Sequence, residues 1–408
     1  MTEDAMARMR PYLVAALFAL ALAASTGVLL RFGIYLGMPA WAANYGAVRH
    51  AHSHLMYFGW GTLGLMALIW ARLPELTGRP LPRGVGLQMA ITTVLSLASY
   101  PAFWPNGYGS TTIGGVSLPF GSITAALNGL PWFLFIALYL RATRALPARP
   151  LPVQLWDWAL ILLVLAAAGA MGVGVQAALG MESHALQEAS LHLFLDLFAT
   201  GWFTLAVLGL LWVWVGETGA EQGQWVAILA LLLSLTFALG MSPTVVPELV
   251  FWLAATANLG AALLLAVHWL RLLRRRRALP ALALFGLSAL GVYLLIAAAI
   301  LVPGLWRWAA GTQLRIFILH TLLLGWMSSA LLGMILSSLG GMAGRLRAAL
   351  SVTWAVGVAA LLLALLGLGL VGLLPVRPIV LLRAAAWSSV VPAGVAVTAF
   401  AASLLPRR

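Results

Sequence analysis

The sequence of 408 residues contains no cysteine and no lysine, and only 8% of its residues are charged. Without cysteine there are no disulfides, thiolate metal sites, iron–sulfur clusters or covalently attached c-type haem. A bound metal would have to be held by histidine, methionine or carboxylate side chains. So little charge, together with 63% hydrophobic residues, excludes an ordinary soluble domain.

Apolar runs of about twenty residues recur along the whole chain, and each is long enough to cross a hydrocarbon core of about 30 Å as a helix. Spans must be helical because unpaired backbone groups are too costly in lipid. We therefore predict an all-α polytopic membrane protein of about twelve spans, forming one transmembrane domain over residues 1–408. The predicted spans lie near 11–32, 50–72, 83–104, 119–142, 153–179, 187–216, 222–242, 246–270, 281–302, 314–339, 347–371 and 377–405.

Two features of the sequence bear on the number of spans. Pro243 and Pro247 lie inside a nearly continuous apolar stretch, so eleven and thirteen spans are the alternatives to twelve. The first apolar run follows Arg8 and Arg10 and lacks a small-residue cleavage site, so we interpret it as a retained span.

All of the 23 basic residues are arginines, and a cytoplasmic N-terminus places most of them on the cytoplasmic side. This positive-inside pattern predicts a multi-pass protein of the bacterial inner membrane with both termini in the cytoplasm. The run from Arg274 to Arg277 is typical of a stop-transfer anchor. The net charge of +13 thus indicates contact with the lipid bilayer and not with nucleic acid.

Histidines are the main polar groups inside the predicted spans, and ionisable residues within a membrane tend to be functional. They open the second span and lie near the start of the sixth and tenth, which all run in the same direction. A Gly-Trp pair follows in each of these spans. This spacing predicts a pseudo-threefold bundle of four-helix units. The residues are His50, His52, His54, His192 and His320, with Gly59-Trp60, Gly201-Trp202 and Gly325-Trp326.

Imidazole is an axial ligand of haem iron, and a glycine on a membrane helix lets a flat ring or another helix approach closely. Two histidines from different helices would make a bis-histidine site. Positions two residues apart on a helix diverge by about 200°, so His52 faces away from His50 and His54. These three side chains therefore do not share one iron.

The second span contains Arg49, His52, Phe58 and Gly59. It resembles the Arg-x-x-His-x5-Phe-Gly signature in subunit I of cbb-type haem–copper oxidases and nitric oxide reductases. The tenth span, with His320 before Gly325-Trp326, is similar to the tenth helix of that family. Both segments also resemble the NnrS family of twelve-span haem- and copper-containing proteins linked to nitric oxide stress.

The resemblance implies one haem b per chain, with His52 and His320 as axial ligands of the iron. Haem propionates need cationic partners on the outer side. For this role the resemblance and the span order favour Arg49, Arg377 and Arg383, and Arg307 and Arg315 compete for it.

The sequence departs from the oxidase pattern where the second, copper-containing centre lies. The position of the high-spin haem ligand is Ile318, and a glycine-based alignment puts Leu197 where the sixth helix carries a copper ligand. The His-His pair of the seventh helix has no counterpart. These departures argue against reduction of oxygen or nitric oxide at such a centre, so copper is not favoured.

The predicted function is therefore haem-based electron transfer with a redox partner protein or quinol, or nitric oxide handling. An enzyme is not favoured, and if there is an activity it is that of an oxidoreductase. One alternative is a cofactor-free, proton-coupled transporter in which the histidines, Asp196 and Glu248 line a path. Another is a copper-binding membrane protein that uses His50, His54 and His192.

Several residues keep alternative interpretations. His54 competes with His52 as haem ligand, because it has the same spacing to Gly-Trp as His320. His192 with Asp196 forms either a second metal site or a polar contact between helices. Glu248 relays protons or caps a helix after Pro247. The remaining histidines, His184 and His268, are expected in an outer loop and near a cytoplasmic helix end.

Overall fold

The computed structural model describes residues 2–217, 219, 223–302, 304–340 and 342–405. Within these ranges, eleven helices are long and apolar enough to cross a membrane. The predicted all-α polytopic membrane fold is confirmed. The predicted seventh span corresponds to α9 (Gly223–Leu235) and η4 (Thr236–Leu239), an apolar helix that is shorter than the eleven.

The chain divides into two compact units, which are described separately. Unit 1 comprises Met1–Ala145 and Leu331–Arg408, and unit 2 comprises Leu146–Ala330. The single domain over residues 1–408 stays a prediction.

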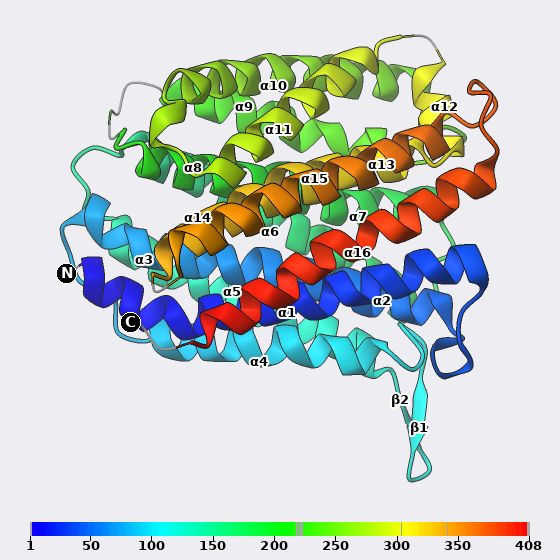
Figure 1. Cartoon of the computed structure of the whole chain (residues 1–408), viewed down its shortest axis with the longest axis horizontal. Coiled ribbons are helices and arrows are strands. Elements are labelled where there is room, and N and C mark those ends of the chain that lie inside the picture. The colour runs from blue at the N-terminus through cyan, green and yellow to red at the C-terminus, as the bar shows by residue number, and fades with distance from the viewer. Residues whose placement is uncertain (1, 218, 220–222, 303, 341, 406–408) are drawn as a thin grey trace. The chain divides into compact units, whose positions relative to one another are not determined.

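Unit 1 joins the two ends of the sequence: α1 and α16 lie side by side along their length (Figure 1). Gly64 lets α14 approach α3 closely, since a Cβ there would lie 3.2 Å from Leu331 Cδ2. The elements are α1 (Thr2–Leu36), η1 (Ala40–Ala42), α2 (Tyr45–His54), η2 (Leu55–Thr62), α3 (Leu63–Thr77), α4 (Val85–Phe103), α5 (Phe120–Thr143), α14 (Ser329–Ser338, which begins in unit 2), α15 (Gly344–Gly369) and α16 (Pro378–Ser403).

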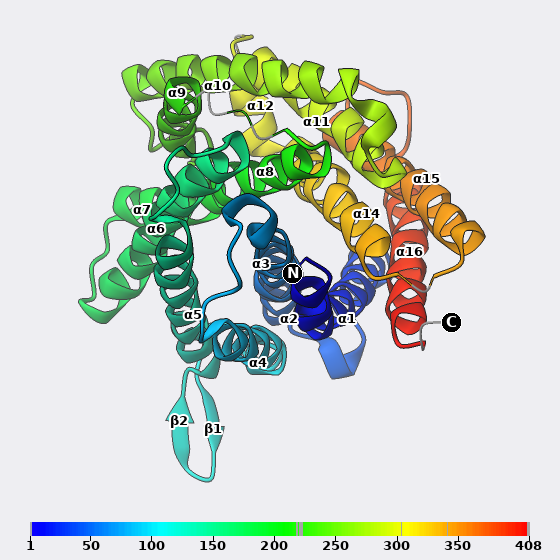
Figure 2. The ribbon, with the colours of Figure 1, turned by 90° about the vertical axis from the view of Figure 1, so that its left-hand side faces the viewer.

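A β-hairpin follows α4 in unit 1 and extends away from α4 and α5 (Figure 2). Strands β1 (Thr111–Ile113) and β2 (Val116–Leu118) pair in antiparallel register. Gly114 and Gly115 connect them with φ of 59° and 84°, conformations that glycine adopts without steric cost. This hairpin was not predicted, although a Gly-Gly pair between β-branched residues is its typical signal.

Unit 2 contains helices that begin at recognisable caps. Ser183 accepts a hydrogen bond from the Leu186 amide at the start of α7, and Pro247 and Pro280 precede α10 and α11. The elements are α6 (Leu151–Ala178), α7 (His184–Asp196), η3 (Leu197–Phe203), α8 (Thr204–Trp214), α9, η4, α10 (Glu248–Arg274), η5 (Arg276–Ala278), α11 (Ala281–Ala299), α12 (Leu305–Gly311), α13 (Leu314–His320) and η6 (Thr321–Ser328).

Three π-helical segments, η2, η3 and η6, interrupt the helices that carry the predicted ligands. They begin directly after His54, Asp196 and His320, and each contains a Gly-Trp pair at the same distance from its start. All three tryptophans of these pairs are fully buried. The repeat predicted from the sequence is thus present in the backbone conformation, and π-helical turns are frequent at functional sites.

The glycines of two of these pairs let another helix approach. A Cβ at Gly59 would lie 2.9 Å from Ala19 of α1, and one at Gly201 would lie 2.8 Å from Leu162 of α6. The close partner at these two glycines is therefore a helix.

Candidate functional site

His52 is held against α1 by its Nδ1 atom, which lies 2.8 Å from the carbonyl oxygen of Ala23. A carbonyl oxygen only accepts, so Nδ1 carries the proton and Nε2 keeps its lone pair. Gly27 provides the space for the ring, because a Cβ there would lie 3.2 Å from His52 Cε1. Metal-ligating histidines usually have this arrangement, in which one ring nitrogen is anchored and the other is the ligand.

His54 points elsewhere, as the helical spacing predicted. Its Nδ1–H donates to the His50 carbonyl at 3.0 Å, and its ring stacks on Phe103 with centroids 3.9 Å apart. Nε2 lies 3.1 Å from the hydroxyl of Tyr108, in the loop before the hairpin. Burial raises the pKa of Tyr108 to about 12, so at neutral pH the hydroxyl is protonated and donates to Nε2. His54 therefore uses both ring nitrogens in hydrogen bonds within the protein.

His320 ends α13 and resembles His54 in its local geometry. Its Nδ1–H donates to the Ile316 carbonyl one turn earlier, at 2.8 Å, which leaves Nε2 as the acceptor nitrogen of the ring. The side chain is half-buried. His52 belongs to unit 1 and His320 to unit 2, so their pairing on one iron stays a prediction.

The three arginines favoured as propionate partners are exposed and belong to unit 1, and their competitors Arg307 and Arg315 belong to unit 2. Arg49 lies on α2, and Arg377 and Arg383 lie at the start of α16. Arg31 of α1, which was not among the predicted site residues, is half-buried and within electrostatic range of His52. Its signal was a cation inside the first apolar run, at the end expected to face outward.

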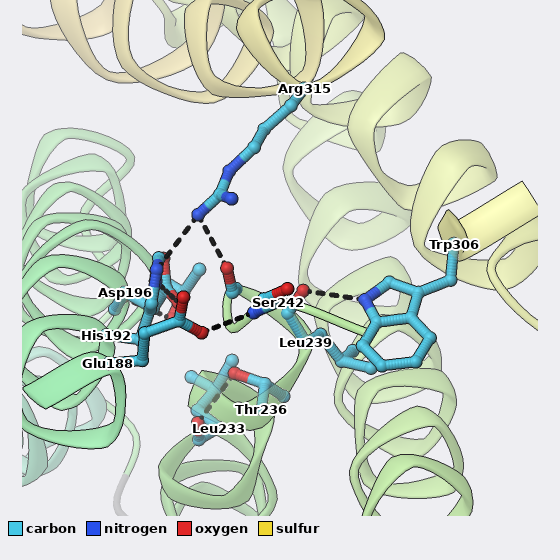
Figure 3. A network of polar contacts seen from close by, with 11 residues as sticks. Glu188, His192, Asp196, Leu233, Thr236, Leu239, Ser242, Trp306 and Arg315 are labelled. Atoms are coloured by element: carbon cyan, nitrogen blue, oxygen red, sulfur yellow. Dashed lines mark hydrogen bonds and ion pairs between the residues drawn. The ribbon is translucent and has the colours of Figure 1, made fainter. Parts of the chain in front are cut away.

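Figure 3 shows a charged network in unit 2 around His192. Arg315 Nη2 donates to His192 Nε2 at 3.0 Å and to the Gly240 carbonyl at 2.6 Å. Because a guanidinium only donates, Nε2 accepts, and His192 Nδ1–H donates to Asp196 Oδ2 at 3.0 Å. His192 and Asp196 both belong to α7, and the polar contact between helices runs from His192 to Arg315 of α13. Binding of a metal by His192, which stays a prediction, would require one of these bonds to break.

Further bonds tie the segment after η4 into this network (Figure 3). The Ser242 amide donates to the Glu188 carboxylate at 2.6 Å, and Trp306 Nε1 donates to the Leu239 carbonyl at 3.0 Å. Gly240 leaves no room for a side chain, since a Cβ there would collide with His192 and Asp196. The network therefore joins α7, α12, α13 and the connection after η4.

Other polar residues occupy more ordinary positions. His184, at the start of α7, is exposed and pairs with Glu188 at 3.2 Å. Glu248 is the first residue of α10, directly after the N-cap residue Pro247, and its carboxylate accepts a hydrogen bond from Trp252 Nε1 at 3.4 Å. Its proposed capping and proton-relay roles stay predictions. His268 is buried in α10 and accepts a hydrogen bond from Trp212.

No group of three or more histidine, aspartate or glutamate side chains able to hold a metal ion is found among the described residues. The copper alternative combines His50 and His54 of unit 1 with His192 of unit 2. It stays a prediction.

No family model matches the sequence, and no curated protein matches it. Among solved structures, the chain is similar to a haem–copper terminal oxidase determined as a dimer by cryo-electron microscopy, with a TM-score of 0.77 and 13% sequence identity. The match covers 99% of this chain and 85% of that chain. At this identity the likeness shows the fold alone.

Proposed function

We propose that this protein binds one haem b through His52 and His320 and transfers electrons in the membrane. The observation that carries the proposal is the anchoring of both imidazoles: each donates Nδ1–H to a backbone carbonyl, so Nε2 carries the lone pair that an axial ligand needs. The likeness of the chain in fold to a haem–copper terminal oxidase supports this assignment.

The hydrogen bonds favour His52 over His54 as the ligand in unit 1. His54 would have to give up the Tyr108 hydroxyl and its stacking on Phe103 to offer Nε2 to iron. The bond from His52 to the Ala23 carbonyl uses Nδ1, so it can stay intact when Nε2 binds iron.

The remaining residues of the proposed site act by charge. Arg31, Arg49, Arg377 and Arg383 would pair with the propionates, and Arg31 has the strongest claim because it lies within range of His52. When bound, haem supplies a one-electron couple. Two strong axial ligands leave no open position, which favours electron exchange with a quinol or a redox protein. A role in nitric oxide handling would require one ligand to be displaced.

The test is the optical spectrum of the detergent-purified protein, oxidised and dithionite-reduced, with a pyridine haemochrome assay. We expect sharp low-spin b-type bands at about one haem per chain. His52→Ala and His320→Ala should each abolish them, whereas the matched variant His54→Ala should retain them. Carbon monoxide should leave the reduced spectrum of the parent protein unchanged.

Three other results would change or reject the proposal. Loss of the bands in His54→Ala, but not in His52→Ala, would move the ligand to His54. A carbon monoxide adduct on the reduced protein would favour nitric oxide handling over electron transfer. Protein that stays colourless after haem supplementation would reject the haem proposal.

A second candidate is a cofactor-free, proton-coupled transporter, and the network of Figure 3 favours it. Asp196, His192 and Arg315 form a chain of donors and acceptors beside the short helix α9, and interrupted helices line substrate paths in transporters. Metal and haem analysis separates the two candidates, since only the first requires iron.

A further inference from the structure

A cavity of about 390 Å³ opens in unit 2 where α10 ends. We call it the basic cavity. It is lined by Leu151, Trp212, Glu217, Gly219, Arg271, Arg274 and Arg275. Its volume lies within the range of small-molecule sites, about 300–1,000 Å³. Because none of these residues belongs to the proposed haem site, this inference does not depend on the proposed function.

The charge of the basic cavity is positive, because three guanidinium groups line it with one carboxylate. Glu217 accepts the Gly219 amide at 3.2 Å. None of the three arginines forms an ion pair with a carboxylate of the described residues. Elsewhere in the unit an arginine beside a carboxylate does pair, as Arg149 does with Asp157 at 2.6 Å. The cavity thus has three cationic groups that outnumber its one carboxylate and form no ion pair among the described residues.

Its walls are built by hydrogen bonds that fix a concave surface. Trp212 is buried, and its Nε1–H donates to His268 Nδ1 at 3.2 Å, which holds the indole against α10. The Leu151 amide donates to the Gly219 carbonyl at 2.9 Å and joins the start of α6 to the segment after α8. The guanidinium groups therefore border a hollow with an apolar side, whereas a solvated row of charges needs no such hollow.

We propose that the basic cavity binds the phosphate group of a phosphate-bearing ligand. Guanidinium groups bind phosphate through paired hydrogen bonds, and several of them around one hollow offer donors from different directions. The apolar side formed by Leu151 and Trp212 suits the carbon atoms next to such a group. The phosphate belongs to an anionic phospholipid headgroup or to a soluble phosphate ester, and the experiment separates these sources.

The experiment compares two double variants that remove the same charge from the same segment. Arg271→Gln with Arg275→Gln takes two cations from the cavity, and Arg276→Gln with Arg277→Gln takes two from the adjoining η5, which does not line it. Binding of phosphatidylglycerol, phosphatidylcholine and inorganic phosphate to the full-length protein is measured by native mass spectrometry and by the shift in thermal unfolding midpoint.

We expect phosphatidylglycerol to bind the parent protein more tightly than phosphatidylcholine. The cavity variant should lose about thirtyfold in affinity, and the η5 variant should lose little. Saturation by inorganic phosphate, lost in the cavity variant alone, would assign the site to a soluble phosphate ester. Equal losses of affinity in both variants would show diffuse surface attraction and overturn the proposal. It would also be overturned if the parent protein bound phosphatidylglycerol no more tightly than phosphatidylcholine and did not bind inorganic phosphate. Equal expression and gel-filtration profiles control for folding.

Discussion

Two π-helical turns, one at the start of η2 in unit 1 and one at the start of η3 in unit 2, have the same backbone conformation but different polar groups. At η2, His54 donates to the carbonyl of its own helix and accepts from the Tyr108 hydroxyl. At η3 the residue in the same position is Asp196, and it accepts from His192, which in turn accepts from Arg315 of another helix. The first turn is surrounded by aromatic rings and the second by charges.

This difference shows that the same π-helical backbone can carry an aromatic site, as at η2, or a charged site, as at η3. The residue directly before a π-helical turn and the residue one helical turn earlier lie on the same face of the helix. At η3 these residues are Asp196 and His192, and together with Arg315 they make a charged link between helices. That link ends on α13, the short helix that also carries His320. The charged region therefore anchors the helix of one proposed ligand.

The largest effect on stability is expected from replacing a glycine by alanine where the added methyl group would meet backbone atoms, which cannot move aside. A Cβ at Gly121 of α5 would collide with the Gly107 carbonyl and the Phe103 ring, beside the loop that carries Tyr108. At Gly240 the obstacles are the side chains of His192 and Asp196, which can shift partly. We expect Gly121→Ala to cost about 2–3 kcal/mol and Gly240→Ala about 1–2 kcal/mol of unfolding free energy.

Thermal unfolding in detergent, followed by fluorescence, tests this order. Gly129→Ala is the matched control on α5, since a Cβ there meets nothing within 4 Å. It should be neutral or slightly stabilising, because alanine favours helix. Similar midpoints for Gly121→Ala and Gly129→Ala would contradict the predicted close approach.

A smaller effect is expected from Arg315→Gln, which weakens the link between α7 and α13. Arg315 is exposed, so we expect a loss of about 1 kcal/mol. If Arg315 positions His320 through α13, the reduced haem bands should shift or broaden as well. The exposed Arg307 of α12 is outside the network, and Arg307→Gln should change neither property.

A double-mutant cycle sharpens this prediction. Arg315 and Asp196 both bind His192, so Arg315→Gln and Asp196→Asn should be non-additive by about 0.5 kcal/mol or more. Additive losses would indicate that His192 does not couple the two charges.

The elements that depend on local chain length and apolarity were predictable from the sequence, and those that depend on contacts distant in sequence were not. The long helices follow from apolar runs, and the divergence of His52 and His54 follows from the helical period. The link from His192 to Arg315 has no sequence signal, because it forms between residues far apart in the chain. The π-helical turns were not predicted, although the Gly-Trp pairs that they contain were recognised as a repeat.

The roles of individual histidines show the same limit. Sequence spacing left His52 and His54 as rivals, because both precede Gly59-Trp60 on one helix. The Ala23 carbonyl and the Tyr108 hydroxyl distinguish them, and these belong to α1 and to the loop before an unforeseen hairpin. Arg31 was overlooked because charge was counted by loops, and this arginine lies inside α1.

The smallest effect is expected from Tyr108→Phe, which removes the hydroxyl that donates to His54 Nε2. We expect a loss of about 0.5 kcal/mol at neutral pH, and haem bands unchanged because His52 is the proposed ligand. New or shifted bands would show that Tyr108 keeps His54 from the iron.

The same variant tests the ionisation of Tyr108. Its pKa in the folded protein is about 12, above the ordinary value of about 10 for tyrosine. Below pH 10 the hydroxyl is protonated in both states, and from pH 10 to 12 the unfolded chain ionises first, so stability falls with rising pH. Tyr108→Phe should lack this component of the fall. The effect should be modest, because the side chain is 47% exposed and solvent screens it. Identical pH profiles for parent and variant would show that the Tyr108 hydroxyl is not shielded from water.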